Sequence, residues 1–430
     1  MAEERMDAIV VGAGPAGAAA ALTLARAGME VVLIERGAAV GSKNMTGGRL
    51  YTHSLQKLCP NFWEEAPVER RVTRELLTFL TPESAVSVDI KSPKFEQNSY
   101  TVLRARFDPW LAEQAEAAGA MVATGVKVDD LIIENGRVIG VRAGEDEMYA
   151  NVVIIAEGAN SLLPRKAGLR TREIDPKHVA TGVKTTIELP TKTIDDRFGL
   201  AGGEGAAQLF VGSVSKGLPG GGFLYTNKDC ISLGLVITVE GMVHNKVRPA
   251  DLMEELKMHP AIAPLIDGGK VVEYSAHLVP EGGVAMMPQI TGDGILVAGD
   301  AAGFVLNLGY AVRGMDFAIA SGIHAAEAAI EAKQKGDYTK AGLAGYEEKL
   351  RNSFVLKELQ HYKDAPHFIE STPRMFTAYP ALLESVLLKM FTVEGTTQPQ
   401  HLMQMMMGEL RGKASLWDLG MDAWKGMRSL

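Results

Sequence analysis

The sequence predicts an α/β fold in which a Rossmann-like domain carries an inserted antiparallel-sheet domain and a helical C-terminal region. Three observations support this class. A strand, a glycine-rich turn and a helix open the chain, short alternating runs separated by glycines fill its middle, and apolar residues at helical spacing dominate its end. We expect the Rossmann-like domain in two parts, residues 1–165 and 291–335. Residues 166–290 should form the antiparallel sheet, and residues 336–430 the helices.

Length and composition indicate a globular protein with a large core. The chain has 430 residues, 47% of them hydrophobic, and a formal charge of -8. This charge gives no general basic field, so nucleic acid is not an expected partner. The two cysteines, Cys59 and Cys230, cannot supply the four ligands of a typical zinc or iron–sulfur site. We therefore expect no bound metal and place any cluster on another chain.

The N-terminus lacks the pattern of a targeting segment. The stretch MAEERMDAIVVGAG enters a strand pattern at once, without the basic and apolar regions of a signal peptide. No apolar run reaches the roughly 18 residues that a membrane span needs. The sequence therefore predicts a cytoplasmic protein.

The first strand and helix carry a dinucleotide-binding fingerprint. Val10 and Val11 end the strand, and Gly12, Gly14 and Gly17 follow at the spacing G-x-G-x-x-G. The first glycine permits the tight turn, the second lets the backbone approach a pyrophosphate, and the third lets the helix lie close to the strand. The alternative is a coincidental glycine-rich turn. The candidate binding residues of this turn are Gly12, Ala13, Gly14, Pro15, Ala16 and Gly17.

The second strand, VVLIE, ends at Glu35, about 20 residues past the glycines. An acidic residue at this place in the fingerprint accepts hydrogen bonds from ribose hydroxyls. We assign four further residues to the same site: Arg36, Gly47, Gly48 and Val128.

Two later strands also end in an acidic residue beside a glycine, Glu157-Gly158 and Gly299-Asp300. In an open α/β sheet, ligands collect at the carboxyl ends of the strands, so these ends and Glu35 should share one long ligand. A carboxylate at the mouth of a buried strand must be hydrogen-bonded. For Asp300 the donor is either a ligand hydroxyl or the N–H groups of the turn that follows; a helix N-cap without a ligand is the alternative.

Three stretches resemble the glutathione-reductase-type FAD enzymes with a single nucleotide-binding fold: the fingerprint, TVLRARFDPWLAEQA and ILVAGDAAGFVLNLGYAVRGMDFAIASG. The resemblance implies that FAD is the cofactor, with Asp300 on its ribityl chain and Arg104 near its phosphate and ribose. It also implies a helix beginning near Val312, whose N-terminus favours negative charge on the reduced flavin. The residues that it places beside the isoalloxazine are Leu308, Gly309 and Tyr310.

Several features bear on the source of the electrons. Flavin hydroxylases carry D-G-x-x-S-x-x-R where this chain reads EGANSLLPR, with Glu157 for the aspartate and Pro164 for the arginine. Residues 160–290 contain no second G-x-G-x-x-G for a nicotinamide cofactor, and the chain has no C-x-x-C pair. We therefore expect electrons to arrive from another protein.

The stretch GLPGGGFLYTN lies in the expected antiparallel sheet. Its composition alone favours a flexible hairpin turn. It is similar, however, to the G-G-S-F-L-Y-H stretch of electron-transfer-flavoprotein:ubiquinone oxidoreductases, although Gly222 and Thr226 replace the serine and the histidine. This resemblance implies a quinone site formed by Gly220, Gly221, Phe223 and Tyr225.

Four stretches closely resemble the C subunit of the nitrogen-fixation-associated Fix complex, also called the bifurcating Etf complex. They are KNMTGGRLYTHSL, APVERRVT, VEYSAHLVPEGG and, within a stretch quoted above, NLGYAVRGMDFAIASG. This subunit belongs to the electron-transfer-flavoprotein:quinone oxidoreductase family. The resemblance implies an FAD-dependent oxidoreductase subunit that accepts electrons from a reduced electron-transfer flavoprotein and passes them to a membrane quinone. The implied partners are the alpha and beta subunits of that flavoprotein, a small ferredoxin-like iron–sulfur subunit and the cytoplasmic membrane surface. Alternatives on the same scaffold are a geranylgeranyl-type prenyl reductase, an aromatic hydroxylase, or a flavin-bound docking scaffold.

The C-terminal helices should carry an apolar face. Leu382, Val386 and Met390 recur at a spacing of four, and Trp417 and Trp424 accompany a cluster of methionines. Such a face suits a membrane interface or a partner subunit, and ordinary core packing is the alternative. We expect the nearby basic residues, Arg374 and Lys389 among them, to be solvated charges.

Overall fold

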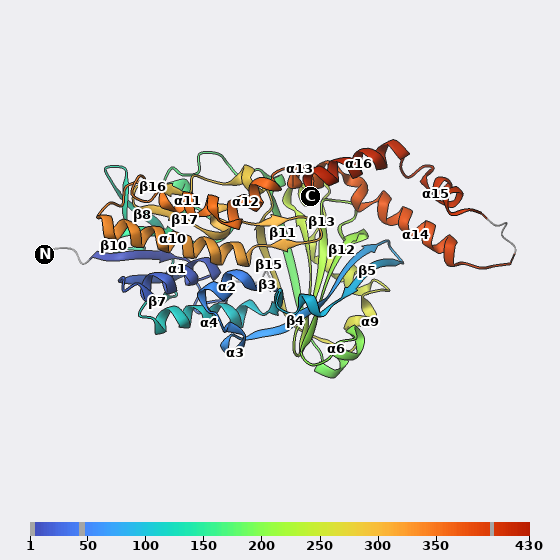
Figure 1. The fold of residues 1–430 in the computed structure, drawn as a ribbon, viewed down its shortest axis with the longest axis horizontal. Helices are drawn as coiled ribbons and strands as arrows, with labels where there is room; N and C mark the ends of the chain where they lie inside the picture. Colours follow the sequence, from blue (N-terminus) through green and yellow to red (C-terminus); the bar gives the residue numbers. More distant parts are fainter. Residues whose placement is uncertain (1–4, 43–47, 396–399) are drawn as a thin grey trace.

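The computed structural model describes residues 5–42, 48–395 and 400–430. Among these residues, eight strands form one large sheet and nine form another, and the two sheets follow one another along the long axis of the molecule (Figure 1). The predicted α/β class, with a second sheet and a helical C-terminal region, is confirmed.

The first sheet has a parallel centre. The fingerprint strand β1 pairs in parallel with β2 on one side and with β10 on the other. Its strands, in spatial order, are β16 (Thr291–Gly292), β17 (Ile295–Val297), β10 (Asp146–Ile155), β1 (Arg5–Val11), β2 (Val31–Glu35) and β7 (Met121–Thr124), with β8 (Asp130–Glu134) and β9 (Arg137–Ala143) extending from β10. The central strands are runs of buried Val, Ile and Leu, as parallel strands covered on both faces must be.

Helices cover this sheet. The fingerprint helix α1 (Pro15–Arg26) packs against both α4 (Arg104–Ala117) and α10 (Met315–Lys335). Ten of the twelve residues of α1 are buried, and most are alanine or glycine. The small side chains let neighbouring helices approach closely, which brings segments from both ends of the chain together.

The second sheet is largely antiparallel. Its strands, in spatial order, are β15 (Lys270–Pro280), β11 (Val179–Glu188), β14 (Cys230–Thr238), β13 (Gly220–Thr226), β12 (Glu204–Gly212), β4 (Val68–Leu80), β6 (Ser99–Val102) and β3 (Arg49–Tyr51), with β5 (Ala85–Lys91) beside β4. Its core contains Leu233, Leu235 and Ile237 of β14, packed with α6 (Thr191–Phe198) and α8 (Pro249–Met258).

This sheet extends beyond the range that the sequence predicts for it. Strands β3 to β6 come from residues 49–102, inside the range assigned to the Rossmann-like domain. They join because β4 pairs in parallel with β12, more than 130 residues away along the chain. The short helices in the segments that form the two large sheets are α2 (Thr52–Leu58), α3 (Phe62–Glu65), α5 (Leu163–Lys166), α7 (Val239–His244) and α9 (Ala263–Ile266).

The helix expected near Val312 begins later. Val312 and Arg313 form β19, which pairs with β18 (Leu306–Asn307) in a hairpin, and α10 starts at Met315. The hairpin uses the backbone groups of residues 312–313, so the helix cannot include them.

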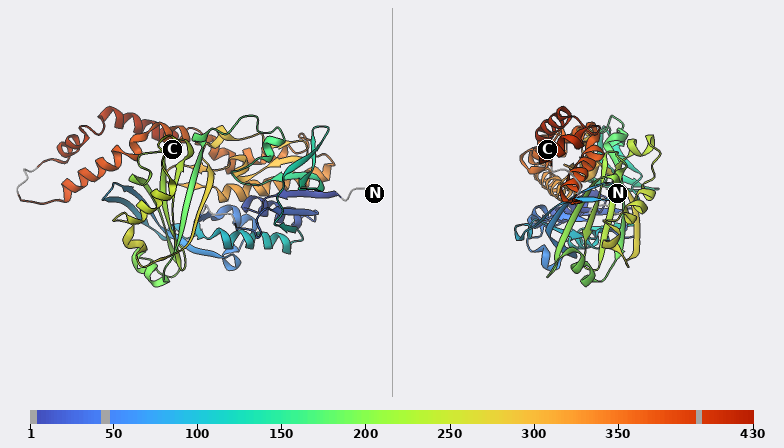
Figure 2. Two further views of the ribbon diagram at one scale, coloured as in Figure 1. Left: turned by 180° about the vertical axis from the view of Figure 1, so that it is seen from behind. Right: turned by 90° about the vertical axis from the view of Figure 1, so that its right-hand side faces the viewer.

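The C-terminal region is helical, as predicted. Its helices are α11 (Gly345–Asn352), α12 (Phe354–His361), α13 (Ala365–Ser371), α14 (Ala378–Phe391), α15 (Leu402–Leu410) and α16 (Leu416–Ser429). Helices α14 and α15 extend past the second sheet as an arm, and α16 returns to the body of the molecule (Figures 1 and 2). Across the described ranges, no helix is both long and apolar enough to cross a bilayer.

Candidate functional site

A cavity of about 830 Å³ lies between the two sheets. The carboxyl ends of β1, β2 and β10 line one side, and β11, β13, β14 and β15 line the other. The sequence-predicted residues that line it are Gly12, Gly14, Pro15, Ala16, Glu35, Arg36, Gly48, Arg104, Val128, Glu157, Gly158, Gly220, Gly221, Phe223, Tyr225, Asp300, Leu308, Gly309 and Tyr310. Ala13, Gly17 and Gly299 do not line it, and Gly47 lies outside the described residues.

The glycines of the fingerprint are required by close backbone contacts. Gly12 has a φ of +103°, and a Cβ on it would lie 2.4 Å from the carbonyl oxygen of Ala156. A Cβ on Gly17 would lie 1.9 Å from the carbonyl oxygen of Gly12. These contacts seat the N-terminus of α1 at the cavity wall, where free backbone N–H groups and the helix dipole favour a pyrophosphate.

Glu35 is held by the turn that it faces. Its two carboxylate oxygens accept hydrogen bonds from the backbone N–H of Ala13 at 3.1 Å and of Gly37 at 2.7 Å. The side chain still lines the cavity and keeps lone pairs for further donors. Its position therefore fits the ribose contact that the fingerprint predicts.

The cavity carries positive charge beside the fingerprint turn. Arg104 donates from Nε and Nη2 to the two oxygens of Asp108, both at 2.7 Å, and Asp108 is fully buried. Burial alone would lower the pKa of Arg104, but Asp108 and Asp300 raise it, so the guanidinium stays charged. Burial, together with Arg104 and Arg36, lowers the pKa of His277 on the same wall. The charged guanidinium of Arg104 lies on the cavity wall, where it fits the phosphate contact that the resemblance predicts.

Asp300 is an acid to which no described residue donates a hydrogen bond. It lies in the short turn Gly299–Ala302, and its carboxylate accepts no hydrogen bond from the described residues. Burial raises its pKa, and Arg104 partly opposes this. The N-cap alternative is wrong, because Ala298 occupies the cap position of that turn. A buried carboxylate of this kind fits a ligand hydroxyl, as on the ribityl chain of FAD.

The carboxylate that follows β10 is hydrogen-bonded within the protein. Glu157 accepts hydrogen bonds from Ser161 Oγ and from the backbone N–H of Leu163, both at 2.8 Å. Burial raises its pKa, and these donors oppose the shift. Glu157 therefore shapes the loop after β10 at the cavity wall.

The glycine-rich stretch is a strand, so the flexible-hairpin alternative is wrong. Gly220, Gly221 and Gly222 belong to β13 and pair with Ile237, Val236 and Leu235 of β14. A Cβ on Gly221 would lie 2.7 Å from the carbonyl oxygen of Phe210, so the strand passes close to its neighbour. The bare backbone leaves room for a flat ring in the cavity.

Two aromatic rings follow on the same strand. The rings of Phe223 and Tyr225 stack with centroids 5.1 Å apart, and both line the cavity. A Cβ on Gly234 would lie 2.1 Å from the ring of Phe223, and one on Gly48 would lie 2.6 Å from the ring of Tyr225. These two glycines therefore fix the stacked pair against the cavity wall.

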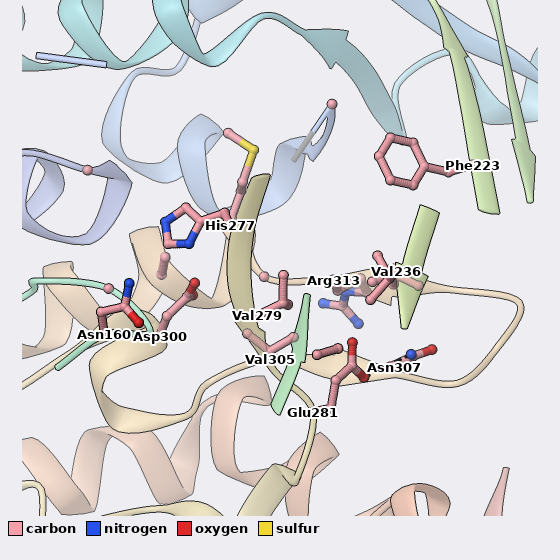
Figure 3. A pocket seen from close by; sticks show the side chains of 18 of the residues that line it. Asn160, Phe223, Val236, His277, Val279, Glu281, Asp300, Val305, Asn307 and Arg313 are labelled. Atoms are coloured by element: carbon pink, nitrogen blue, oxygen red, sulfur yellow. Dashed lines mark hydrogen bonds between the residues drawn. The ribbon is translucent and has the colours of Figure 1, made fainter. Parts of the chain in front are cut away.

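Sequence reasoning missed the wall formed by β15. His277 and Val279 alternate along the end of this strand, Glu281 directly follows it, and all three line the cavity. In Figure 3, His277 and Asp300 lie toward one side of the cavity, and Glu281 and Asn307 toward the other. The alternation in AHLVPEG was the available signal, since every second residue of a strand faces the same side.

The fold is that of FAD-dependent oxidoreductases. Residues 7–196 match a family model described as FAD dependent oxidoreductase. Residues 204–279 match one described as ETF-QO, ubiquinone-binding, and residues 365–430 match the ETF-QO/FixC family C-terminal domain.

Curated relatives match over the full length. The probable electron transfer flavoprotein-quinone oxidoreductase YdiS of Escherichia coli (strain K12) is 51% identical, with 100% of each chain covered. The protein FixC of the same strain is 48% identical, again with 100% of each chain covered. The chain belongs to the ETF-QO/FixC family, in which it is an FAD-dependent oxidoreductase of electron transfer.

Solved structures share the fold at low identity. A geranylgeranyl bacteriochlorophyll reductase-like protein from Thermoplasma acidophilum superposes with a TM-score of 0.72 at 21% identity, covering 96% of this chain and 97% of its own. The myxobacterial chondrochloren halogenase CndH gives a TM-score of 0.67 at 18% identity, covering 96% and 99%. At these identities the likeness concerns the fold alone.

Proposed function

We propose that this chain accepts electrons from a reduced electron-transfer flavoprotein and passes them through FAD to a membrane quinone. The observation that carries the proposal is one continuous cavity, which joins the strand ends of the FAD-binding half to the glycine-rich strand of the ubiquinone-binding half. The names of the full-length relatives, electron transfer flavoprotein-quinone oxidoreductase and FixC, supply the donor and acceptor.

In this proposal the fingerprint turn and the basic residues hold the phosphates of FAD. Gly12, Gly14 and the start of α1 provide backbone N–H groups, and Arg104 provides charge. Glu35 accepts from the adenosine ribose and Asp300 from the ribityl chain. The remaining cofactor contacts are the sequence-predicted residues that line the cavity: Pro15, Ala16, Arg36, Gly48, Val128, Glu157, Gly158, Leu308, Gly309 and Tyr310.

The other half of the cavity receives the quinone. Gly220 and Gly221 leave the strand backbone bare, and Phe223 and Tyr225 give an aromatic wall. A planar headgroup packs well on such surfaces. When bound, FAD collects electrons and delivers a pair of them, which is the chemistry that a quinone requires.

The proposal extends to an electron-bifurcating complex. Its members are the alpha and beta subunits of the electron-transfer flavoprotein, a small ferredoxin-like iron–sulfur subunit and this chain, on the cytoplasmic face of the membrane. Cys59 and Cys230 are both free thiols, so a cluster would belong to the small subunit. The exposed apolar arm formed by α14 and α15 supports a peripheral contact with the bilayer.

The test is an anaerobic flavin trace with the purified FAD-loaded chain. We expect NADH alone to leave the flavin oxidised, NADH with the electron-transfer flavoprotein to reduce it, and a soluble quinone analogue to oxidise it again. Rapid reduction by NADH or NADPH in the isolated chain would contradict the proposal. A flavin that stays oxidised in the presence of the reduced flavoprotein would contradict it as well.

A further inference from the structure

Glu281 is a carboxylic acid on the cavity wall, and the proposed function above assigns it no role. It directly follows β15, whose alternating residues His277 and Val279 face the same cavity. It lies on the far side of the cavity from Asp300 and beside Asn307, in the hairpin that leads to Leu308 and Gly309 (Figure 3). Glu281 is therefore at the end of the cavity where the redox-active ring is proposed to bind.

The surroundings of Glu281 favour a protonated carboxyl group. Its Oε2 accepts one hydrogen bond, from Nδ2 of Asn307 at 2.9 Å, and no described residue forms an ion pair with it. Burial raises its pKa to about 7, and the hydrogen bond from Asn307 opposes the shift. The titratable groups on the elements around it are Lys177 and His178 before β11, Asp300, Tyr310, Arg313 of β19 and Glu370 of α13.

The other acids of the cavity are placed differently. Asp300 interacts with Arg104, and Glu157 accepts two hydrogen bonds and interacts with Arg36. Both therefore belong to the basic end of the cavity. The phenol of Tyr225 holds its proton tightly, because burial raises its pKa well above the usual value. Glu281 combines a neutral hydrogen-bond donor, the absence of an ion-pair partner among the described residues, and a position facing the cavity.

We propose that Glu281 is the residue that donates a proton to the quinone during its reduction, an inference that rests on the proposed function. A quinone takes up two electrons and two protons and becomes a quinol. Both electrons and one proton come from the two-electron-reduced cofactor. The second proton passes from the carboxyl group of Glu281 to a quinone oxygen, and the carboxylate left behind takes up a proton from water before the next turnover.

Asn307 has a defined part in this mechanism. Its amide N–H stabilises the carboxylate that remains after the proton has left, since a hydrogen bond to the charged form of an acid favours that form. The side chain also fixes the orientation of the carboxyl group. Asn307 is therefore a positioning residue, and removing its amide should raise the pKa of Glu281 further.

The first experiment measures the oxidation of the reduced flavin by a soluble quinone analogue between pH 5 and pH 9. In the wild type, the rate should fall as pH rises through about 7. Glu281→Gln should lower the rate about 100-fold or more and remove this pH dependence, as for loss of a general acid. Asn307→Ala should keep the pH dependence but move its midpoint upward. Glu370→Gln, which changes a carboxyl group on another wall of the cavity, should leave the midpoint in place.

The second experiment does not depend on turnover. An infrared titration of the FAD-loaded protein should show the C=O band of a carboxylic acid that disappears near pH 7. The band should be missing in Glu281→Gln and should titrate at higher pH in Asn307→Ala. Because the wild-type and Asn307→Ala titrations need no Glu281 variant, they decide the question even if Glu281→Gln does not fold.

The outcomes separate the two proposals. A flavin that is reduced by the electron-transfer flavoprotein and oxidised by quinone with the wild-type pH profile in Glu281→Gln would overturn the role of Glu281 alone. A wild-type flavin that the quinone does not oxidise would overturn the proposed function, and this role with it. An infrared band that Asn307→Ala does not move would contradict the coupling between the two side chains.

Discussion

Asp300 shows how a single side chain can indicate a ligand. An acid with no hydrogen bond from the described residues lowers the stability of a protein unless a ligand satisfies it. In the structure this acid lies at the end of β17 with its carboxylate toward the cavity, across from Arg104. We therefore expect the side chain to contribute to ligand binding more than to folding.

We expect Asp300→Ala to weaken FAD binding by about 10- to 150-fold. This factor corresponds to about 1.5–3 kcal/mol, the contribution of one hydrogen bond to a charged group. The free energy of unfolding of the FAD-free protein should not fall, because no described residue donates to this carboxylate. The measurements are flavin content, FAD titration and chemical denaturation. Asp146→Ala, an exposed acid of the same sheet, is the control. Equal flavin content in the two variants would contradict the assignment.

Glu281 should make stability depend on pH. Its pKa rises from 4.5 to about 7 in the folded protein, so between these pH values the folded state holds a proton that the unfolded chain has released. The free energy of unfolding therefore falls as pH rises through this window and stays lower above it. Stability is lost because the charged carboxylate of Glu281 is buried with only one hydrogen bond, from a neutral donor.

Glu281→Gln removes this cost. We expect the variant to exceed the wild type in stability at pH 8 by roughly 1–3 kcal/mol and to approach it at pH 4.5. Urea denaturation at several pH values measures the difference. Glu348→Gln, at an exposed position of α11, should show no such trend. A constant difference between Glu281→Gln and the wild type at all pH values would indicate a packing effect in place of ionisation.

Helices α1 and α10 show how one contact between elements shapes the site. A Cβ on Gly322 of α10 would lie 2.1 Å from the carbonyl oxygen of Ala16 in α1. This contact places α10 directly behind the fingerprint turn. The glycine is therefore required for close helix packing, with the backbone in an ordinary helical conformation.

We expect Gly322→Ala to destabilise the protein by about 1–3 kcal/mol and to reduce FAD content, because the added methyl group pushes α10 away from Ala16. The matched control is Gly420→Ala in α16, an exposed helical glycine with no atom within 4 Å of its Cβ position. That change should be neutral or stabilise by up to about 1 kcal/mol. Thermal melts and flavin absorbance measure both. Destabilisation of similar size in the two variants would argue against a specific α1–α10 contact.

Local patterns predicted the elements well where the signal lay within a short stretch. The strand, turn and helix around Gly12, the strand that ends at Glu35 and the helical C-terminus follow from spacing and composition. Long-range pairing was not predictable in this way. Nothing local indicates that β4 pairs with β12, or that residues 312–313 enter a hairpin before α10.

The candidate site was also predictable from local patterns but not from long-range contacts. The strand ends that line the cavity were found because each carries an acidic residue and a glycine in sequence. Glu281 and Asn307 were missed because their meaning depends on a contact between two separate parts of the chain. Arg374 and Lys389, expected to be solvated, form ion pairs with Asp422 and Glu409, which also come from later helices.

At the scale of the whole molecule, the arm formed by α14 and α15 exposes several large apolar side chains. Phe391 of α14 and Met403 of α15 are 79% and 68% exposed, and Val393, just after α14, is 91% exposed. Ion pairs fix the arm internally and at its base, from Lys389 to Glu409 and from Arg374 to Asp422. An apolar projection next to a proposed quinone cavity suits the interface of a bilayer, where a membrane quinone is found.

We therefore expect the double variant Phe391→Ser and Met403→Ser to bind anionic liposomes at least tenfold more weakly, since burying one large apolar side chain contributes about 1.5–3 kcal/mol. Its flavin content and its oxidation by a soluble quinone analogue should match the wild type, because both residues lie outside the cavity lining. Oxidation by a long-chain quinone in liposomes should slow. Ile133→Ser, at an exposed apolar position of β8, is the control and should change none of these. Unchanged liposome binding, with loss of binding to the electron-transfer flavoprotein, would instead identify the arm as a docking surface for a subunit.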